Sequence, residues 1–333
     1  MKPKLTFFTK FLAVLLACIS VLYLINKKYV GGYYYYSVYN EIESMKDVPE
    51  NLTFVNFGTS HGLCSFRYTN EDLAEGCYNL ALSGSDIYHN FATLKQFTEN
   101  LSQGCIVVIP TSYFSFCMST DEPSQKRYYL YLDKEYINEF SYETLINAKY
   151  IPALRSGEFI IKDIIHDQNI NAQNMMSSDT DEEKDINTNS TVMESDAAYT
   201  DDVLVHIKEL ETHAAGRSVS WRLAYMNLYS SYMDSNTQLL TDMVNYCYDH
   251  GFEPILVTTP VYTALNEEFS DEELDEYYFS NVKKVAENTG CRYIDLSHDE
   301  EISNNPDCFG NSDHLSEYGS VVFMEKFRNI ISG

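Results

Sequence analysis

An apolar segment at the start of the chain constrains its fold more than any other feature of the sequence. Residues 5–25 read LTFFTKFLAVLLACISVLYLI, in which Lys10 is the only charged side chain. At about 1.5 Å per helical residue, such a segment reaches ~30 Å, the thickness of the hydrocarbon core of a bilayer. We therefore expect a transmembrane helix over residues 5–25, followed by a body that folds in water.

Basic residues flank this segment unevenly, because Lys2, Lys4, Lys10 and the α-amino group precede the apolar core and only Lys27 and Lys28 follow it. An excess of Lys and Arg favours the cytoplasmic side of a membrane. The pattern predicts a single-pass protein of the cytoplasmic membrane, with its N-terminus inside and its body outside.

A cleaved signal peptide is the alternative, because a charged start and an apolar middle are common to both kinds of segment. Cys18 follows Leu-Leu-Ala, which resembles a lipoprotein cleavage box. However, the apolar run continues for seven residues beyond Cys18, and no small-x-small site follows Ile25 before Gly31 and Gly32. These features favour an uncleaved signal anchor.

The net charge of −26, from 49 acids and 23 bases, is concentrated in two segments. Residues 167–202 hold ten acids and one base, and residues 267–276 hold seven acids and no base. No basic stripe is present and the overall charge repels a phosphate backbone, which excludes nucleic acid as a partner. The segment 167–202, rich in Asn, Ser, Thr and Asp, is expected to be a disordered insertion.

Short apolar runs alternate with helical patterns over the rest of the chain. The runs that read as strands cover residues 52–57, 78–82, 105–109, 253–258 and 291–296. Apolar periodicity predicts helices over 86–101, 228–248, 271–288 and 316–331. This alternation predicts an α/β fold built on a doubly wound, flavodoxin-like parallel sheet.

The expected organisation has three parts. A cytoplasmic stub and anchor occupy residues 1–28, a juxtamembrane connector follows over 29–50, and one α/β domain covers 51–333 around the acidic insertion. Seven cysteines lie outside the anchor, with no CxxC pair and no Cys/His metal spacing. We therefore expect no metal site, no cofactor and no disulfide framework, although one or two bridges remain open.

Ser60 is the strongest candidate for chemistry. It follows the first predicted strand, at the expected start of a helix, where backbone N–H groups favour developing negative charge. A serine hydroxyl needs a base within hydrogen-bond reach to act as a nucleophile. On this pattern alone, a simple helix N-cap is an equally good interpretation.

His314 supplies a candidate base, in a polar loop directly before the last helix. The carboxyl ends of parallel strands gather at one edge of the sheet, so the loops that carry Ser60 and His314 are expected to converge there. Among the three positions before His314, Asp313 is the only carboxylate, and it is the expected partner of the ring.

Four short blocks carry a resemblance to a known superfamily. They are VNFGTSHG, NLALSGS, VIPTSYFSF and NSDHLSEYG. With them, the chain resembles the SGNH/GDSL superfamily of esterases and acyltransferases. In particular, it resembles the membrane-anchored branch that includes the D-alanyl-lipoteichoic-acid transfer proteins and the alginate-type O-acetyltransferases. The resemblance covers residues 52–333 with the anchor in front.

The resemblance implies roles for individual residues. Ser60 would form an acyl-enzyme, Gly84 would donate a backbone N–H to the oxyanion, and His314 would act as general base. The superfamily often has an oxyanion Asn in the third block, and this chain has none, so Ser112 is the candidate there. The usual acid position, three residues before the histidine, is Asn311, so either Asp313 or Asn311 would orient the ring.

The leading hypothesis is a membrane-anchored extracytoplasmic O-acyltransferase that moves an acetyl or D-alanyl group onto a cell-envelope polymer. The resemblance implies that a multi-span membrane O-acyltransferase passes on the acyl group. A serine esterase with water as acceptor is the first alternative. A non-catalytic SGNH-type fold used for binding or scaffolding is the second, because of the departures at Asn311 and in the third block.

Overall fold

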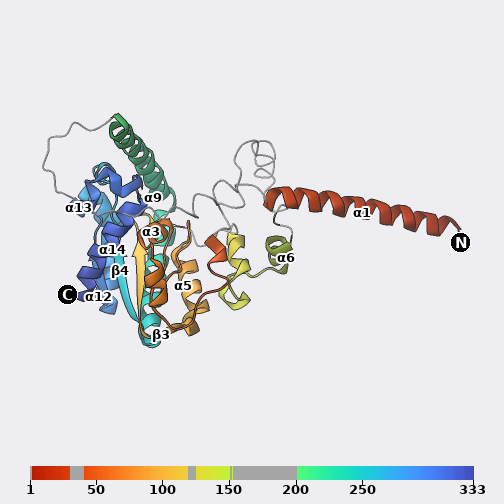
Figure 1. Ribbon diagram of the computed structural model, residues 1–333, viewed down its shortest axis with the longest axis horizontal. Helices are drawn as coiled ribbons and strands as arrows, with labels where there is room; N and C mark the ends of the chain where they lie inside the picture. The colour runs from red at the N-terminus through yellow and green to blue at the C-terminus, as the bar shows by residue number, and fades with distance from the viewer. Residues whose placement is uncertain (1, 31–40, 119–124, 151, 153–200) are drawn as a thin grey trace. The chain divides into compact units, whose positions relative to one another are not determined.

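The computed structural model describes residues 2–30, 41–118, 125–150, 152 and 201–333 (Figure 1). Contacts group the chain into two compact units. The helical unit is formed by residues 1–46 and 124–194, and the α/β unit by residues 47–123 and 195–333. Residues 167–200 of the predicted insertion lie outside the described residues, as do residues 31–40 of the predicted connector.

The helical unit contains the N-terminal apolar helix α1 (Lys2–Val30). Its segment Phe7–Val30 contains an 18-residue window with a mean hydropathy of 2.3, and none of that window is buried. Within the described residues, it is the one helix whose length and composition fit a membrane span or signal anchor. Shorter elements follow, namely the 3₁₀ turns η3 (Gln125–Leu130) and η4 (Lys134–Tyr136) and the helix α6 (Tyr142–Tyr150).

The α/β unit is built on a parallel sheet of five strands in the order β2-β1-β3-β4-β5. This is the doubly wound, flavodoxin-like order, so the predicted fold class is confirmed. The strands are β1 (Leu52–Asn56), β2 (Cys77–Asn79), β3 (Leu101–Thr111), β4 (Glu253–Thr258) and β5 (Arg292–Asp295).

Alternating strand residues cover the two faces of the sheet, as the pleat requires. Ile255 and Val257 of β4 share a core cluster with Phe323 and Phe327 of α14 (Glu317–Ser332). Leu256, between them, is also fully buried. Helix α9 (Asp201–Asp249) contacts β4, and both α5 (Ile87–Gln96) and α12 (Ser280–Thr289) pack against α9.

Several predicted boundaries were wrong, among them the end of the second strand, which stops at Asn79 instead of residue 82. The helix predicted over 86–101 is α5, which ends at Gln96, and Leu101 already belongs to β3. That strand runs through Pro110 to Thr111, whereas the prediction ended it before the proline. Proline is tolerated there because β1 ends opposite Val108, so Pro110 pairs with β4 alone.

The helices after the insertion also differ from the prediction. Helix α9 begins at Asp201, far ahead of the predicted start at 228, and Asp201 and Asp202 belong to it instead of the insertion. The predicted helix over 271–288 is divided into α11 (Asp271–Leu274), a π-helical turn η6 (Asp275–Phe279) and α12. The acids of its first turn suit the positive end of the helix dipole.

Candidate active site

Ser60 is positioned by a tight turn between β1 and the short helix α3 (Ser60–Ser65). Gly58 in this turn has a φ of 119°, a conformation that favours glycine. Thr59 then caps α3, because its hydroxyl accepts a hydrogen bond from the backbone N–H of His61 at 3.3 Å. Ser60 therefore lies at the carboxyl edge of β1, as predicted.

Two further contacts hold α3 against the sheet. A Cβ at Gly62 would come within 2.5 Å of the carbonyl oxygen of Phe57, so only glycine allows this close approach. The buried Asn56 donates from Nδ2 to the carbonyl of Gly62 at 3.3 Å and to Oδ1 of Asn79 at 2.9 Å. Together they fix the helix that presents Ser60.

His314 reaches Ser60 from the other end of the chain. It lies on β7 (His314–Leu315), which pairs with β6 (Phe309–Asn311) just before α14. Its Nε2 is 2.6 Å from the Oγ of Ser60, a hydrogen bond between residues 254 positions apart. The structure thus joins the two main residues that the sequence predicted.

Asn311 sets the tautomer of the His314 ring. The Oδ1 of Asn311 accepts hydrogen bonds from the backbone N–H groups of Asp313 and His314, at 3.2 and 3.0 Å. The same oxygen is 2.9 Å from Nδ1 of His314. Because this oxygen can only accept, Nδ1 must carry the proton, which leaves a lone pair on Nε2 facing the Ser60 hydroxyl.

Asp313 contributes a buried negative charge beside the ring. Its carboxylate is fully buried, and its Oδ1 lies 3.3 Å from Nδ1 of His314. Arg217 of α9 holds the other oxygen, with its Nε and Nη2 atoms 2.8 and 2.7 Å from Oδ2. Asn311 is therefore the closer hydrogen-bond acceptor for the ring, and Asp313 is the charged group that lies slightly farther from the same ring nitrogen.

The pKa of Asp313 follows from these contacts. Burial acts to raise the pKa of its carboxyl, but contacts with His314 and His61 outweigh burial and hold the pKa well below its usual range. The carboxylate is therefore charged at neutral pH and can stabilise a positive charge on His314.

Two more histidines surround the same carboxylate. The ring of His61 stacks on that of His314, with centroids 4.8 Å apart, and its Nε2 is 3.4 Å from Oδ2 of Asp313. Burial lowers the pKa of His61, contact with Asp313 opposes this only in part, and His314 lowers the pKa further. His213 of α9 contacts Ser312 through Nδ1 at 2.8 Å and lies 3.8 Å from Asp313.

Gly84 lies in the loop beside the Ser60 turn. The backbone N–H of Leu82 donates to the carbonyl of Gly58 at 3.1 Å, and that of Ser85 donates to the carbonyl of Leu82 at 3.0 Å. Gly84, within this second turn, has a φ of 64° and is exposed. These bonds tie the loop of Gly84 to the turn of Ser60.

Ser112 is not brought to Ser60 by any contact among the described residues. Its backbone N–H donates to the Oγ of Ser115 at 2.9 Å, and the two hydroxyls are 3.2 Å apart. It is also almost completely buried. Its hydrogen bonds close the turn that follows β3.

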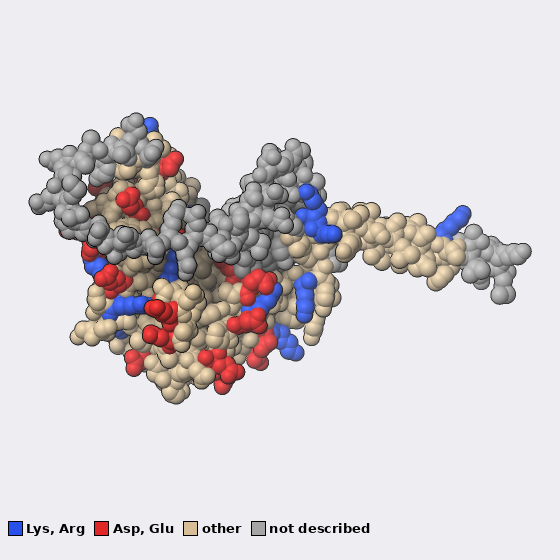
Figure 2. Space-filling view, in the orientation of Figure 1, with Lys and Arg blue, Asp and Glu red and all other residues tan. Residues whose placement is uncertain are grey.

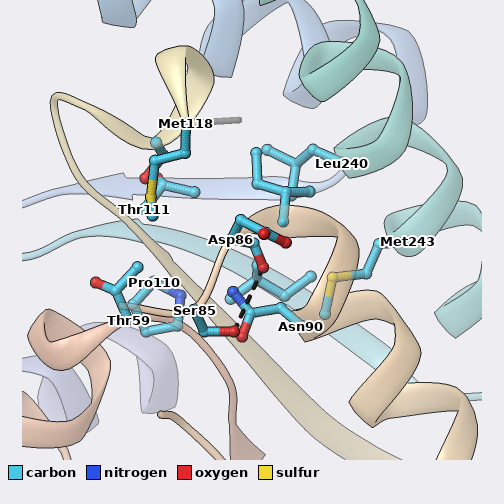
Figure 3. A pocket seen from close by; sticks show the side chains of 12 residues that line it. Thr59, Ser85, Asp86, Asn90, Pro110, Thr111, Met118, Leu240 and Met243 are labelled. Carbon is cyan, nitrogen blue, oxygen red and sulfur yellow. Dashed lines mark hydrogen bonds between the residues drawn. The ribbon is translucent and has the colours of Figure 1, made fainter. Parts of the chain in front are cut away.

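A small cavity lies behind the Ser60 turn, between β3, α5 and α9 (Figure 3). Thr59, Asp86 and Asn90 line it with polar atoms, and Met118, Leu240 and Met243 with apolar ones. Its volume of about 10 Å³ has room for roughly one water molecule. This cavity is therefore too small to hold a substrate, whereas Ser60 itself is partly exposed.

His61, Asp313 and His314 are the one group of described side chains with metal-binding geometry, since their ligand atoms lie within 4.8 Å of one another. The chemistry of the group does not suit a cation, however. Arg217 already occupies one carboxylate oxygen, and His314 directs its nitrogens to Ser60 and Asn311. Too few free lone pairs remain for a zinc-type site, which needs at least three protein ligands.

Sequence reasoning missed Arg217, His213 and the stacking of His61. Arg217 and His213 lie on the part of α9 for which no element was predicted. Their spacing of four residues places them on one face of a helix, which would have been a signal if that helix had been recognised.

Comparisons with known proteins give little further information. No protein-family model matches the chain, and no curated protein matches it. Among solved structures, it is similar to one from Bacteroides fragilis NCTC 9343 that carries an acylhydrolase assignment. The identity is 11%, the TM-score is 0.39, and the match covers 87% of this chain and 93% of that one.

The lowered pKa of His61 predicts acid-sensitive stability. The folded protein holds the pKa of this ring below that of the unfolded chain, which protonates it below about pH 6.5, so the ring charges at a lower pH in the folded state. The unfolded state therefore binds more protons as the pH falls from 7 to 5, and stability drops by at most about 1.4 kcal/mol per pH unit from this group. Denaturant unfolding of the full chain at several pH values measures this slope.

The variant His61→Phe should show a flatter slope over the same range. Asp313, whose pKa is also lowered, does not interfere, because its contribution is lost only below its unfolded pKa of about 3.9. Equal slopes for the two proteins would contradict a neutral, buried His61.

Proposed function

We propose that the protein is a serine acyl-transfer enzyme anchored in the cytoplasmic membrane, with Ser60 as the nucleophile and His314 as the general base. The observation that supports this best is the 2.6 Å hydrogen bond from the Ser60 hydroxyl to Nε2 of His314. A nucleophile, a base in reach and a group that orients the base are the features that acyl transfer through serine requires.

The first half-reaction forms an acyl-enzyme. The Oγ of Ser60 attacks the acyl carbonyl of the donor while its proton passes to Nε2 of His314. The tetrahedral intermediate then breaks its bond to the donor's leaving group, which takes that proton from His314. In the second half-reaction, His314 accepts the proton of an acceptor hydroxyl, the acceptor oxygen attacks the acyl group, and Ser60 is released with its proton restored.

The oxyanion of each intermediate would be stabilised by the backbone N–H groups of Ser60 and Gly84. This assignment is supported by the hydrogen bonds that tie the Gly84 loop to the Ser60 turn. Donors fixed in this way need no rearrangement as charge develops. Ser112 is not retained as an oxyanion donor in this proposal, because its N–H and hydroxyl both contact Ser115.

The role of a triad acid would be divided between two residues. Asn311 orients the ring and sets its tautomer, whereas Asp313 supplies the negative charge that stabilises the imidazolium. Arg217 holds that carboxylate in place and balances its charge while His314 is neutral. This division explains how the site can work with Asn311 at the position where the superfamily has its acid.

The acceptor is proposed to be a hydroxyl of a cell-envelope polymer, with the acyl group, acetyl or D-alanyl, passed on by a multi-span membrane O-acyltransferase. The exposed apolar helix α1 supports a position at the membrane. The outward orientation of the α/β unit rests on the uneven lysines around α1.

Hydrolysis is the second candidate function, and the openness of the site favours it. Ser60 and His314 are both partly exposed, and the cavity behind Ser60 holds about one water at most. A transferase must keep water from the acyl-enzyme, and a hydrolase must admit it. Product analysis with a chromogenic acetate ester, with and without a sugar acceptor, separates the two.

If the role of the triad acid is divided between Asn311 and Asp313, substitutions at the two positions should have unequal effects on the rate. Asp313→Asn should lower the rate of ester cleavage on the order of 10²-fold, because Arg217 would then face the imidazolium without its counter-charge. Asn311→Ala should cost about tenfold, because the oxygen of Asp313 at 3.3 Å can accept the ring proton instead. Cleavage of a chromogenic acetate ester measures both. The reverse order would contradict the division.

The proposed reaction also predicts an effect in the cell. Replacing Ser60 with Ala removes the nucleophile without adding bulk, so the ester content of the envelope polymers should fall to the level of a strain that lacks the protein. Mild alkaline release of the acyl groups, followed by their quantification, measures this content. Unchanged content in the Ser60→Ala strain, beside a clear loss in the deletion strain, would refute the acyltransferase proposal.

A further inference from the structure

Helix α6 carries an apolar stripe that the described part of the helical unit leaves largely exposed. Tyr142, Ile146 and Tyr150 are 68%, 50% and 63% exposed. They follow one another at intervals of four residues, so they lie on a single face of the helix. The opposite face packs inward through Ala148, which is buried. A contiguous apolar face of this kind is typical of a surface that contacts another apolar surface.

The C-terminal end of α6 lies beside α1, and the position of this contact along α1 sets how deep α6 would lie in a membrane. Tyr150 shares an apolar groove of about 220 Å³ with Ile19, Leu22, Tyr23 and Asn26. If α1 spans a membrane, its outer limit is marked by Lys27 and Lys28. Tyr23 lies four residues before Lys27, which is about 6 Å along the helix. Helices that lie in the membrane interface bury their apolar face by ~5–10 Å. The distance of about 6 Å between Tyr23 and the end of the spanning segment agrees with this depth.

The residue types of the stripe are also those expected at the boundary between the hydrocarbon core and the lipid headgroups. Tyrosine is enriched where a hydrocarbon core meets the headgroups, because its ring is apolar and its hydroxyl is polar. Phe140 packs edge to face on Tyr142, and Lys149, in the last turn, lies 5.8 Å from the ring of Tyr150. Lys149 can extend its ammonium group to lipid phosphates. Figure 2 shows that α1 carries no charged side chain over most of its visible length, with Lys or Arg atoms only towards its two ends.

We propose that α6 is an interfacial helix that inserts Tyr142, Ile146 and Tyr150 into the outer leaflet of the membrane in which α1 is anchored. The inference rests on the proposed anchoring by α1. It assigns the helical unit a role of its own, as a second contact with the lipid surface besides the spanning helix.

Tryptophan fluorescence of the full chain in phosphatidylcholine vesicles tests this proposal. The variant Ile146→Trp places a reporter in the stripe, and Glu135→Trp, at an exposed charged position of the same unit, is the matched control. The signal of native Trp221 is removed by subtracting the parent protein. With lipids brominated near the headgroup, we expect the Ile146→Trp emission to be shifted to the blue and reduced by roughly half, as for a buried interfacial side chain.

Each result has one meaning. If the chain does not float with the vesicles, the anchoring by α1 fails. If it floats but the emission maximum of Ile146→Trp stays at the long wavelength of a water-exposed tryptophan and is not quenched, the stripe faces water. This result would refute the interfacial helix and leave the anchoring by α1 supported. A blue but unquenched emission means that protein covers the stripe, and equal quenching at Glu135→Trp means that α6 is not a specific contact. Either of these last two results would also overturn the proposal. Tyr142→Trp repeats the reading at a second position of the stripe.

Discussion

The hydrogen bond between Ser60 and His314 is the contact on which the proposed chemistry of this protein depends. It joins the turn after the first strand to the loop before the last helix. Only a parallel sheet whose strand ends share one edge brings these segments together. The geometry of this hydrogen bond is maintained by the glycines at positions 58 and 62, by the cap at Thr59 and by the hydrogen bonds of Asn311.

The sequence was sufficient to predict the five strands of the parallel sheet, the class of sheet and the pairing of Ser60 with His314, but not the short β6 and β7 on which the His314 loop is built. These features depend on local apolar runs and on the general rule for strand ends. Boundaries were less predictable, because they depend on neighbours. Pro110 can stay within a strand only because β1 has already ended, and nothing in the residues around Pro110 indicates this.

The electrostatics of the site were the least predictable part. Asp313 was the expected partner of His314 because it is the nearest carboxylate in sequence, yet the closest acceptor for the ring is the neutral Asn311. The position of Arg217 depends on the N-terminal part of α9, which begins next to the acidic insertion and was not predicted. A buried carboxylate that contacts one arginine and lies near three histidines arises only from tertiary packing, so no spacing in the sequence reveals it.

The central claim is that Ser60 is a nucleophile activated by His314. Labelling of the full chain with a fluorophosphonate probe, followed by identification of the modified peptide, tests this most directly, because the probe reacts with activated serines. The account predicts modification at Ser60 in the parent protein and none in the variant His314→Ala. Absence of labelling in the parent, or equal labelling of the variant, would contradict it and favour a fold used for binding alone.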